Sequence, residues 1–268
     1  MIRGIDHVVI AVRDLEGASE HYRQLGFTVT PGGEHTGGVT HNALIPFADG
    51  SYLELIAFRE PDREQDHKWW AKLANGEGTV DYALLSDGLA AEAARLRDAG
   101  IDVAGPVDGG RQRPDGQRIA WRSLTQSAGE VPLPFVIEDV TDRHLRVPAG
   151  AAATHPLGVA GVAGLVILVP NLERATTAYE ALLGAAAQPS ASTIEGAAKA
   201  VRIPCGAAWI ELVEPEANAD ALQRHIRRRA AAPYETILAG TGSAAADLAM
   251  STAHGARVRI EPAAEYPR

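Results

Sequence analysis

The sequence predicts an α+β fold of tandem βαβββ modules. Two observations lead to this prediction. Strands rich in β-branched residues alternate with helices of regular apolar spacing, and the pattern of the first module returns 157 residues later. The chain has 268 residues, of which 46% are hydrophobic and 22% are charged. This composition is typical of a globular protein, and the length suffices for one large domain or two ordinary ones.

The first module begins with a strand at residues 5–12, which are rich in Val and Ile and bounded by turn-forming residues. Asp14 takes the position of a helix N-cap, and Gly26 follows the helix as its C-terminal glycine. The apolar residues between them recur at helical spacing: Leu15, Ala18, Tyr22 and Leu25. Two strands at residues 42–47 and 51–58, joined by an Ala-Asp-Gly turn, complete the module.

The third module repeats this arrangement with the same spacing. Residues 165–169 form the strand, and Asn171 takes the place of the cap. The helical stripe returns as Leu172, Ala175, Tyr179 and Leu182. Residues 209–213 (WIELV) match residues 52–56 (YLELI) at the same offset, so two separate elements support one repeat.

A weaker copy forms the second module. A strand at residues 79–86 precedes a helix that Gly100 closes, and strands follow near residues 118–124 and 133–137. The helical stripe consists of Leu89, Ala93 and Leu96.

The fourth module is truncated, with a strand at residues 234–239, a helix at 243–254 and a strand at 257–261. Residues 141–158, rich in Ala, Gly and Pro, are the expected boundary between two pairs of modules. The predicted domains are residues 1–148, with modules at 1–60 and 78–140, and residues 156–268, with modules at 160–216 and 232–262.

Four such modules, opening with Ile5-Asp6-His7-Val8-Val9-Ile10, resemble the vicinal oxygen chelate superfamily. Residues 31–35 (PGGEH), 40–42 (THN) and 52–56 (YLELI) are similar to its glyoxalase-like branch, and the resemblance covers essentially the whole chain. It implies paired modules whose curved mixed sheets form a cup around a divalent metal ion, with ligands on the strands that carry His7 and Glu54. One fold hosts many reactions, so the site must be argued from its own residues.

Side-chain alternation places His7 and Glu54 on the concave face of neighbouring strands. Imidazole and carboxylate suit Zn²⁺, Mn²⁺, Fe²⁺ or Ni²⁺, and the sequence does not separate these metals. Glu54 would be a metal ligand, or a catalytic general base if it leaves the metal. His41 is the expected third ligand, with His35 beside it as the other candidate. The alternative for His35 and His41 is that both are ordinary loop residues. The alternative for His7 is a buried histidine that is hydrogen-bonded to Glu54.

The second module departs from the superfamily pattern. Tyr82 and Phe135 stand where its own metal ligands would be, and in the third module the matching residues are Gly164 and Glu211. Two histidines and a carboxylate are the ligands of non-haem iron oxygenases, so Tyr82 argues against an extradiol dioxygenase. The same departure argues against glyoxalase I activity.

Arginine side chains are the candidates for binding an anionic substrate. Arg118 and Arg122 share one face of a strand, and guanidinium groups bind carboxylates or phosphates in a bidentate way. The alternative is that both arginines are solvated. Trp69, next to Trp70, would be a lid over the cup or a plug between modules, with one of the two buried and the other near the rim. The further candidate substrate contacts are Tyr82 and Trp121.

Charge and cysteine content exclude several functions. The net charge of −9 does not suit a nucleic-acid binder, and a single Cys excludes a disulfide framework within the chain. The sequence shows no signal peptide or apolar run long enough to span a membrane, so we expect a cytoplasmic protein. Cys205 has no basic neighbour, which favours a structural thiol.

The expected function is therefore a metal-assisted lyase or isomerase that acts on a small oxygenated, anionic molecule. The competing hypothesis is a non-catalytic protein that binds or sequesters a small molecule in the same cup without a metal. Neither hypothesis involves nucleic acid or a membrane, and a homodimer is compatible with both.

Overall fold

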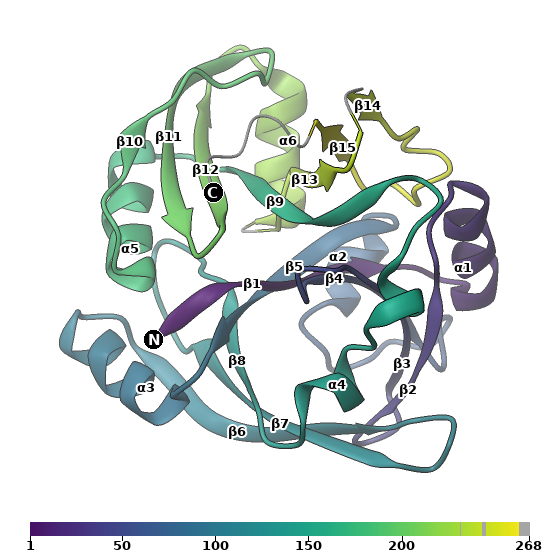
Figure 1. Ribbon diagram of the computed structural model, residues 1–268. Helices are drawn as coiled ribbons and strands as arrows, with labels where there is room; N and C mark the ends of the chain where they lie inside the picture. Colours follow the sequence, from purple (N-terminus) through teal and green to yellow (C-terminus); the bar gives the residue numbers. More distant parts are fainter. Residues whose placement is uncertain (231, 243–244, 263–268) are drawn as a thin grey trace.

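The computed structural model describes residues 1–230, 232–242 and 245–262. The chain forms two sheets, a closed eight-stranded barrel in the N-terminal half and an open seven-stranded sheet in the C-terminal half (Figure 1). This is the α+β arrangement of curved mixed sheets that the sequence predicts.

The barrel closes because the first strands of its two modules lie side by side. Strand β1 pairs in parallel with β4 of its own module and antiparallel with β5 of the second module. In order around the barrel, the strands are β1 (Ile2–Ala11), β4 (Tyr52–Phe58), β3 (Thr40–Pro46), β2 (Thr30–His35), β6 (Val103–Gln112), β7 (Arg118–Gln126), β8 (Phe135–Asp139) and β5 (Gly78–Ser86).

Helices pack against the strands of the barrel. The helices of this half are α1 (Leu15–Gln24), α2 (Trp70–Ala74), α3 (Leu89–Asp98) and α4 (Arg143–Arg146). The predicted N-cap is confirmed, because the Asp14 side chain accepts hydrogen bonds from the backbone N–H groups of Glu16 and Gly17. Val8 and Tyr22 belong to the core under the outer helices, whereas Val9 belongs to a separate cluster within the barrel that includes Trp69.

The C-terminal half is an open sheet with the order β10-β11-β12-β9-β13-β15-β14. Its elements are η1 (Gly150–Ala153), a 3-10 helix that leads into it, β9 (Val159–Leu168), α5 (Leu172–Leu183), β10 (Gln188–Pro189), β11 (Ala197–Cys205), β12 (Ala208–Pro215), α6 (Asp220–Arg229), β13 (Glu235–Gly240), β14 (Ala246–Asp247) and β15 (Val258–Glu261). Strand β9 begins and ends 157 residues after β1. The register also corresponds, since His7 lies opposite Tyr52 and Gly164 lies opposite Trp209.

The helix predicted at residues 243–254 is wrong within the described part of this segment. Residues 243–244 lie outside the described residues, and residues 245–254 form the short strand β14 and turns. Contacts with the N-terminal half hold this segment in place, because the Tyr22 hydroxyl donates a hydrogen bond to the carbonyl oxygen of the buried Ala253. Tertiary contacts of this kind override the weak helical preference of a run of small residues.

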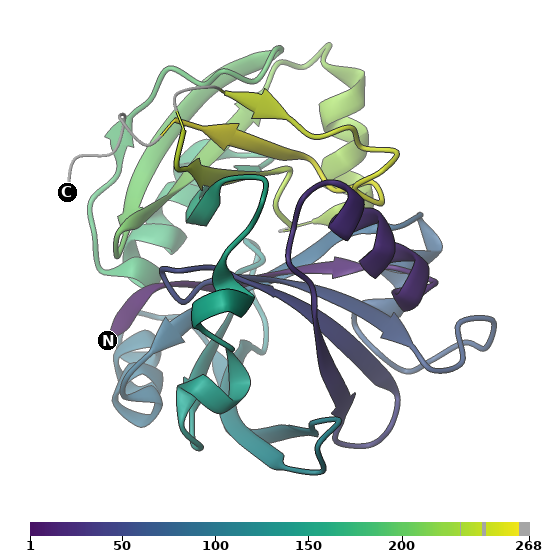
Figure 2. The same cartoon turned by 45° about the vertical axis from the view of Figure 1, so that its right-hand side comes forward.

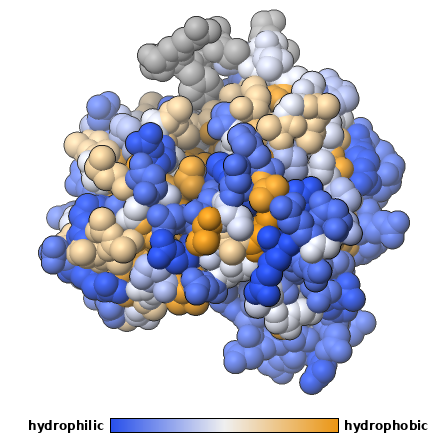
Figure 3. Space-filling view, turned by 60° about the horizontal axis from the view of Figure 1, so that its bottom comes forward, coloured by the Kyte–Doolittle hydropathy of each residue, from blue (hydrophilic) through white to orange (hydrophobic). Residues whose placement is uncertain are grey.

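One hydrophobic core extends from the helices of the barrel into those of the open sheet. Within it, the buried hydroxyl of Tyr82 donates a hydrogen bond of 3.0 Å to that of Tyr179. The turned view in Figure 2 shows the two halves packed closely against each other. The face in Figure 3 is largely hydrophilic, with small separate apolar patches. Among the described helices, none has both the length and the apolar character needed to cross a membrane.

Candidate functional site

A cavity of about 250 Å³ lies within the barrel. Its wall combines titratable groups with aromatic rings: His7, His35, Glu54, His67, Arg111 and Arg146, together with Tyr52, Trp69, Trp121 and Phe135. The cavity thus contains the two residues that the resemblance assigns to a metal, His7 and Glu54. Its mixture of polar and aromatic walls is typical of a small-molecule site.

An irregularity in β1 brings Asp6 and His7 to the same place. The register with β5 shifts between Ile5 and His7, as at a β-bulge. The Asp6 carboxylate lies 2.6 Å from His7 Nδ1, so it holds the imidazole with Nε2 on the side of Glu54. The distance from His7 Nε2 to Glu54 Oε2 is 3.5 Å, and the ring stacks on Tyr52 at 4.6 Å between centroids.

Arginines from the segment after β8 fix Asp6. Arg146 Nη1 and Nη2 each donate to an oxygen of Asp6 at 2.8 Å, and Arg143 donates to the same carboxylate at 2.7 Å. Burial alone would raise the pKa of Asp6, but the charge and hydrogen bonds of Arg146 hold that pKa well below its usual range. Asp6 is therefore ionised, and it orients His7 as carboxylates do behind metal-binding histidines.

Glu54 receives polar contacts from two further strands. Asn42 Nδ2 donates to Glu54 Oε1 at 2.6 Å, and His35 Nε2 lies 3.5 Å from the same oxygen. The other nitrogen of His35 is hydrogen-bonded to the Thr40 hydroxyl at 2.9 Å. Burial would raise the pKa of Glu54, but the neighbouring imidazoles of His35 and His7 and the Asn42 amide lower it to about 2.

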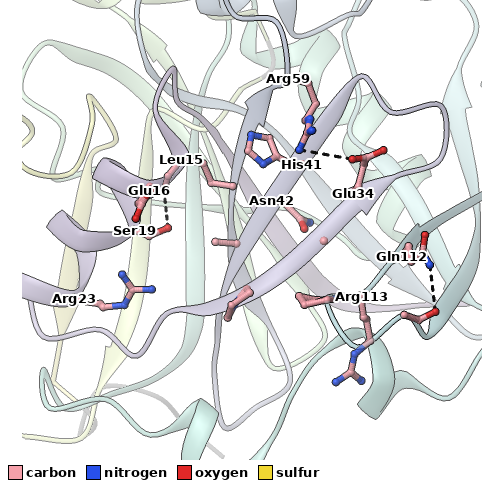
Figure 4. A pocket seen from close by; sticks show the side chains of 15 residues that line it. Leu15, Glu16, Ser19, Arg23, Glu34, His41, Asn42, Arg59, Gln112 and Arg113 are labelled. Carbon is pink, nitrogen blue, oxygen red and sulfur yellow. Dashed lines mark hydrogen bonds and ion pairs between the residues drawn. The ribbon is translucent and has the colours of Figure 1, made fainter.

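His41, the expected third ligand, lies on the opposite face of the sheet. It is the second residue of β3 and pairs with Ala57, so its side chain alternates away from Asn42 and Glu54. His41 lines a separate outer groove of about 680 Å³ with Arg59 and Glu34 (Figure 4). Burial and the Arg59 charge lower the pKa of His41. The structure therefore corrects the choice between the two histidines, because His35 rather than His41 lies beside Glu54.

Two of the predicted aromatic contacts line the cavity. The Trp69 Nε1 group donates to Asp81 at 2.8 Å, and Trp69 is buried while Trp70 is only partly so. Trp121 lies across Gly109 on the neighbouring strand, where a Cβ atom would come within 2.4 Å of the indole nitrogen. The side chain of Trp121 reaches the cavity because Gly109 leaves that space free.

Three predicted substrate contacts lie elsewhere. Tyr82 is buried in the core between the halves rather than in the cavity. Arg118 is exposed, and Arg122 forms a 2.7 Å ion pair with Glu138. Both arginines alternate with Trp121 along β7, so the inward orientation of Trp121 places them on the outer face.

Arg111 on β6, like Arg146, is a cavity arginine that the sequence analysis did not select as a substrate contact. It pairs with Ile119 across the β6–β7 hairpin and shares the inward face with Trp121. Its guanidinium donates to Asn42 Oδ1 at 3.2 Å and to the carbonyl oxygen of Arg146 at 2.8 Å. Side chains alternate along β7, so Arg122 and Trp121 point to opposite faces. The same alternation, followed through the Pro-Asp-Gly turn into β6, predicts that Arg111 lies on the face of Trp121.

The equivalent face of the C-terminal sheet is filled. Trp209 packs over Gly164, where a Cβ atom would come within 2.3 Å of the ring. Leu222 of α6 joins Trp209 in the cluster on this face. Glu211 is buried and accepts hydrogen bonds from Ser190, Ser192 and Arg202, so its carboxylate is satisfied by the protein.

The side chains around the barrel cavity include imidazole and carboxylate groups, which are ligand types of divalent metal ions. Within residues 1–230, 232–242 and 245–262, no group of three or more His, Cys, Asp or Glu side chains is arranged so that it could hold a metal ion. His7 Nε2 and His35 Nε2 nevertheless each lie 3.5 Å from a different oxygen of Glu54. Ligands on one cation at bond lengths of about 2.1 Å are separated by roughly 3–3.5 Å. The sequence argument against a set of two histidines and one carboxylate was that Tyr82 replaces the second histidine. His35 beside Glu54 supplies that second histidine, so this argument no longer applies.

Cys205 is buried, and burial raises the pKa of its thiol to about 12. A thiol with such a pKa is protonated at neutral pH, which agrees with the predicted structural role.

Comparison with solved structures supports the fold. A hypothetical protein from Staphylococcus aureus gives a TM-score of 0.70 at 13% identity, covering 96% of this chain and 98% of that one. A mutant of 4-hydroxymandelate synthase from Streptomyces coelicolor gives 0.61 at 15% identity, covering 89% of this chain and 71% of that one. At these identities the similarity establishes the fold alone. A search of curated protein sequences gave no significant match.

A family model described as a glyoxalase-like domain matches residues 5–183. The match begins within β1, includes the other strands of the barrel and continues through β9 and α5 of the second half. It covers more than half of the chain and agrees with the paired βαβββ modules around the cavity. The chain therefore belongs to the glyoxalase-like domain family.

Proposed function

We propose that the barrel cavity binds a divalent metal ion through His7, His35 and Glu54 and catalyses a lyase or isomerase reaction on a small oxygenated molecule. The observation that carries this proposal is the approach of two imidazole Nε2 atoms to one buried carboxylate, each at 3.5 Å. The distal nitrogen of each ring is already engaged, by Asp6 and by Thr40. This arrangement supports metal binding because it turns both Nε2 atoms toward Glu54, although His35 Nε2 also lies 3.4 Å from the Asn42 amide nitrogen.

A bound divalent ion would act as a Lewis acid that polarises a substrate oxygen. Glu54 is suited to hold the ion, because its two carboxylate oxygens each face an imidazole Nε2 atom at 3.5 Å. Trp69 and Trp121 contribute apolar walls that exclude water from the substrate.

The metal content of the purified protein tests this proposal. Wild-type protein prepared without chelators and incubated with Zn²⁺, Mn²⁺, Fe²⁺ or Ni²⁺ should retain one of these metals at close to one equivalent per chain. The variants His7→Ala, His35→Ala and Glu54→Gln should not retain the metal. Each should lower the affinity for the metal by more than the roughly 10–100-fold that removal of an orienting group costs. Inductively coupled plasma mass spectrometry after gel filtration measures the retained metal.

His41→Ala is the matched control, because His41 lies one strand away from the same carboxylate but on the outer face. It should bind metal like the wild type. Less than about 0.1 equivalent in the wild type would contradict the metal-assisted reaction. That result would favour the competing hypothesis, in which the same cavity binds a small molecule without a metal.

A further inference from the structure

Arg111 is a buried cation that lacks an acidic partner. Only 4% of its surface is exposed, and its two Nη groups donate to neutral oxygens, those of the Asn42 amide and the Arg146 carbonyl. Its Nε group has no hydrogen-bond partner in the described part of the chain. Within that part, no Asp or Glu oxygen comes within 4.0 Å of its guanidinium.

The other buried arginine shows how unusual this environment is. Arg146 is 2% exposed and bonds the carboxylates of Asp6 and Asp139. Those two acids raise the pKa of Arg146 although burial opposes this, whereas burial lowers the pKa of Arg111. Burying a charge costs free energy unless an opposite charge and hydrogen bonds compensate it. Arg111 has hydrogen bonds to neutral groups, but no acidic group in direct contact.

We propose that Arg111 binds the carboxylate of the substrate, so that the cavity takes small monocarboxylates with an apolar or aromatic substituent. This inference rests on the proposed function, since it names the substrate class of the same cavity. Arg111 supplies one positive charge without an acid in direct contact, which matches a monoanion better than a phosphate dianion close to Glu54. Arginine also binds planar carboxylates through paired N–H groups.

The neighbours of Arg111 fix the orientation of such a ligand. Asn42 contacts Arg111 through its amide oxygen and Glu54 through its amide nitrogen, at 3.2 and 2.6 Å. A carboxylate at Arg111 would therefore have its adjacent atoms near the group formed by His7, His35 and Glu54. Trp121 and Phe135 line the same cavity and provide apolar contacts for the remainder. The volume of 250 Å³ lies below the roughly 300–1,000 Å³ of sites for drug-sized ligands, which restricts the ligand to a small molecule.

Calorimetric titration of EDTA-treated protein tests this inference independently of any metal. The probes are two isosteric pairs, benzoate with benzamide and propanoate with propanamide, at pH 7. Wild-type protein should bind at least one carboxylate about 10–100-fold more tightly than its amide, as expected for hydrogen bonds to a charged group. Arg111→Met should abolish this preference. Arg118→Met removes the same charge from the outer face of the barrel and should leave the preference unchanged.

Three outcomes would overturn the inference: equal affinity of the wild type for carboxylate and amide, no binding of either carboxylate below about 20 mM, or an unchanged preference in Arg111→Met. Circular dichroism monitors folding of the variants. If Arg111→Met does not fold, Arg111→Gln, which keeps a donor for Asn42, should show the same loss of preference. Because the metal is removed in every titration, failure of metal binding does not affect the result.

Discussion

His225 on α6 lies in surroundings that disfavour protonation of its imidazole. It packs edge-on against Tyr234 at 5.0 Å between ring centroids, and its Nε2 atom has no hydrogen-bond partner within the described residues. Burial, reinforced by the charges of Arg229, Arg257 and Lys72, lowers its pKa to about 4. Folding therefore requires the neutral form of this histidine.

We predict that His225 makes the protein less stable in acid. An unfolded histidine has a pKa of about 6.5, so the stability contributed by the neutral form is complete above that pH and is lost as pH falls toward 4. Between pH 7 and 4.5 the wild type should lose about 2–3 kcal/mol more free energy of unfolding than His225→Gln. Urea denaturation at both pH values measures the difference. His144→Gln, at an exposed histidine, should behave like the wild type, and parallel pH dependences of wild type and His225→Gln would contradict the prediction.

Single residues also explain which parts of the site the sequence could predict. Alternation along one strand suffices to place His7 and Glu54 on the inner face, because each strand alternates regardless of its neighbours. The choice between His35 and His41 depends on where β2 ends and β3 begins, which the sequence does not determine. The position of Arg111 could be predicted only if the inward face of β7 were known. That face is established only by the position of Trp121 in the folded barrel.

At the scale of elements, local signals gave most of the strands and caps. Asp14 and Asn171 both cap their helices as predicted, because capping depends only on the first turn. The predicted helix at 243–254 failed because Ala253 and its neighbours are held by contacts with α1 from a distant part of the chain. Local composition contains no information about such contacts.

Helices α2 and α6 occupy corresponding places in the order of elements of the two halves, but α6 is longer. The short α2 packs at one end of the barrel, where Leu73 joins the cluster of Val9. The longer α6 brings Leu222 to the cluster of Trp209 on the matching face. Because both helices bring a leucine to the corresponding cluster, the indole of Trp209 over Gly164 is what distinguishes the filled face from the open cavity.

We expect Gly164→Ala to destabilise the C-terminal sheet by about 1–3 kcal/mol, because the added methyl group would come within 2.3 Å of the Trp209 ring. Urea unfolding followed by circular dichroism measures this loss. Gly242→Ala is the control, since a Cβ atom there meets nothing within 4 Å. In the Trp209→Leu background the same glycine substitution should cost little, and equal costs in both backgrounds would exclude the indole as the cause.

At the scale of the molecule, the buried Tyr82–Tyr179 hydrogen bond joins the two halves within one core. We predict that Tyr82→Phe and Tyr179→Phe each lower the free energy of unfolding by about 1–3 kcal/mol, since each leaves a buried hydroxyl without its partner. The double variant should be less destabilised than the sum of the two.

Differential scanning calorimetry should show one transition for the wild type and for all three variants, because a continuous core unfolds as a unit. Two resolved transitions, or additive effects of the two substitutions, would show that the halves are energetically independent.

The indole of Trp209 over Gly164 has a consequence for regulation. Although the chain contains the same strand arrangement twice, Trp209 and Leu222 pack on the second face, at the place that corresponds to the barrel cavity. The two sheets therefore do not offer a matched pair of sites that could be coupled within one chain. A single chain would respond to its ligand along a hyperbolic saturation curve, and a sigmoidal response would have to arise from the association of several chains.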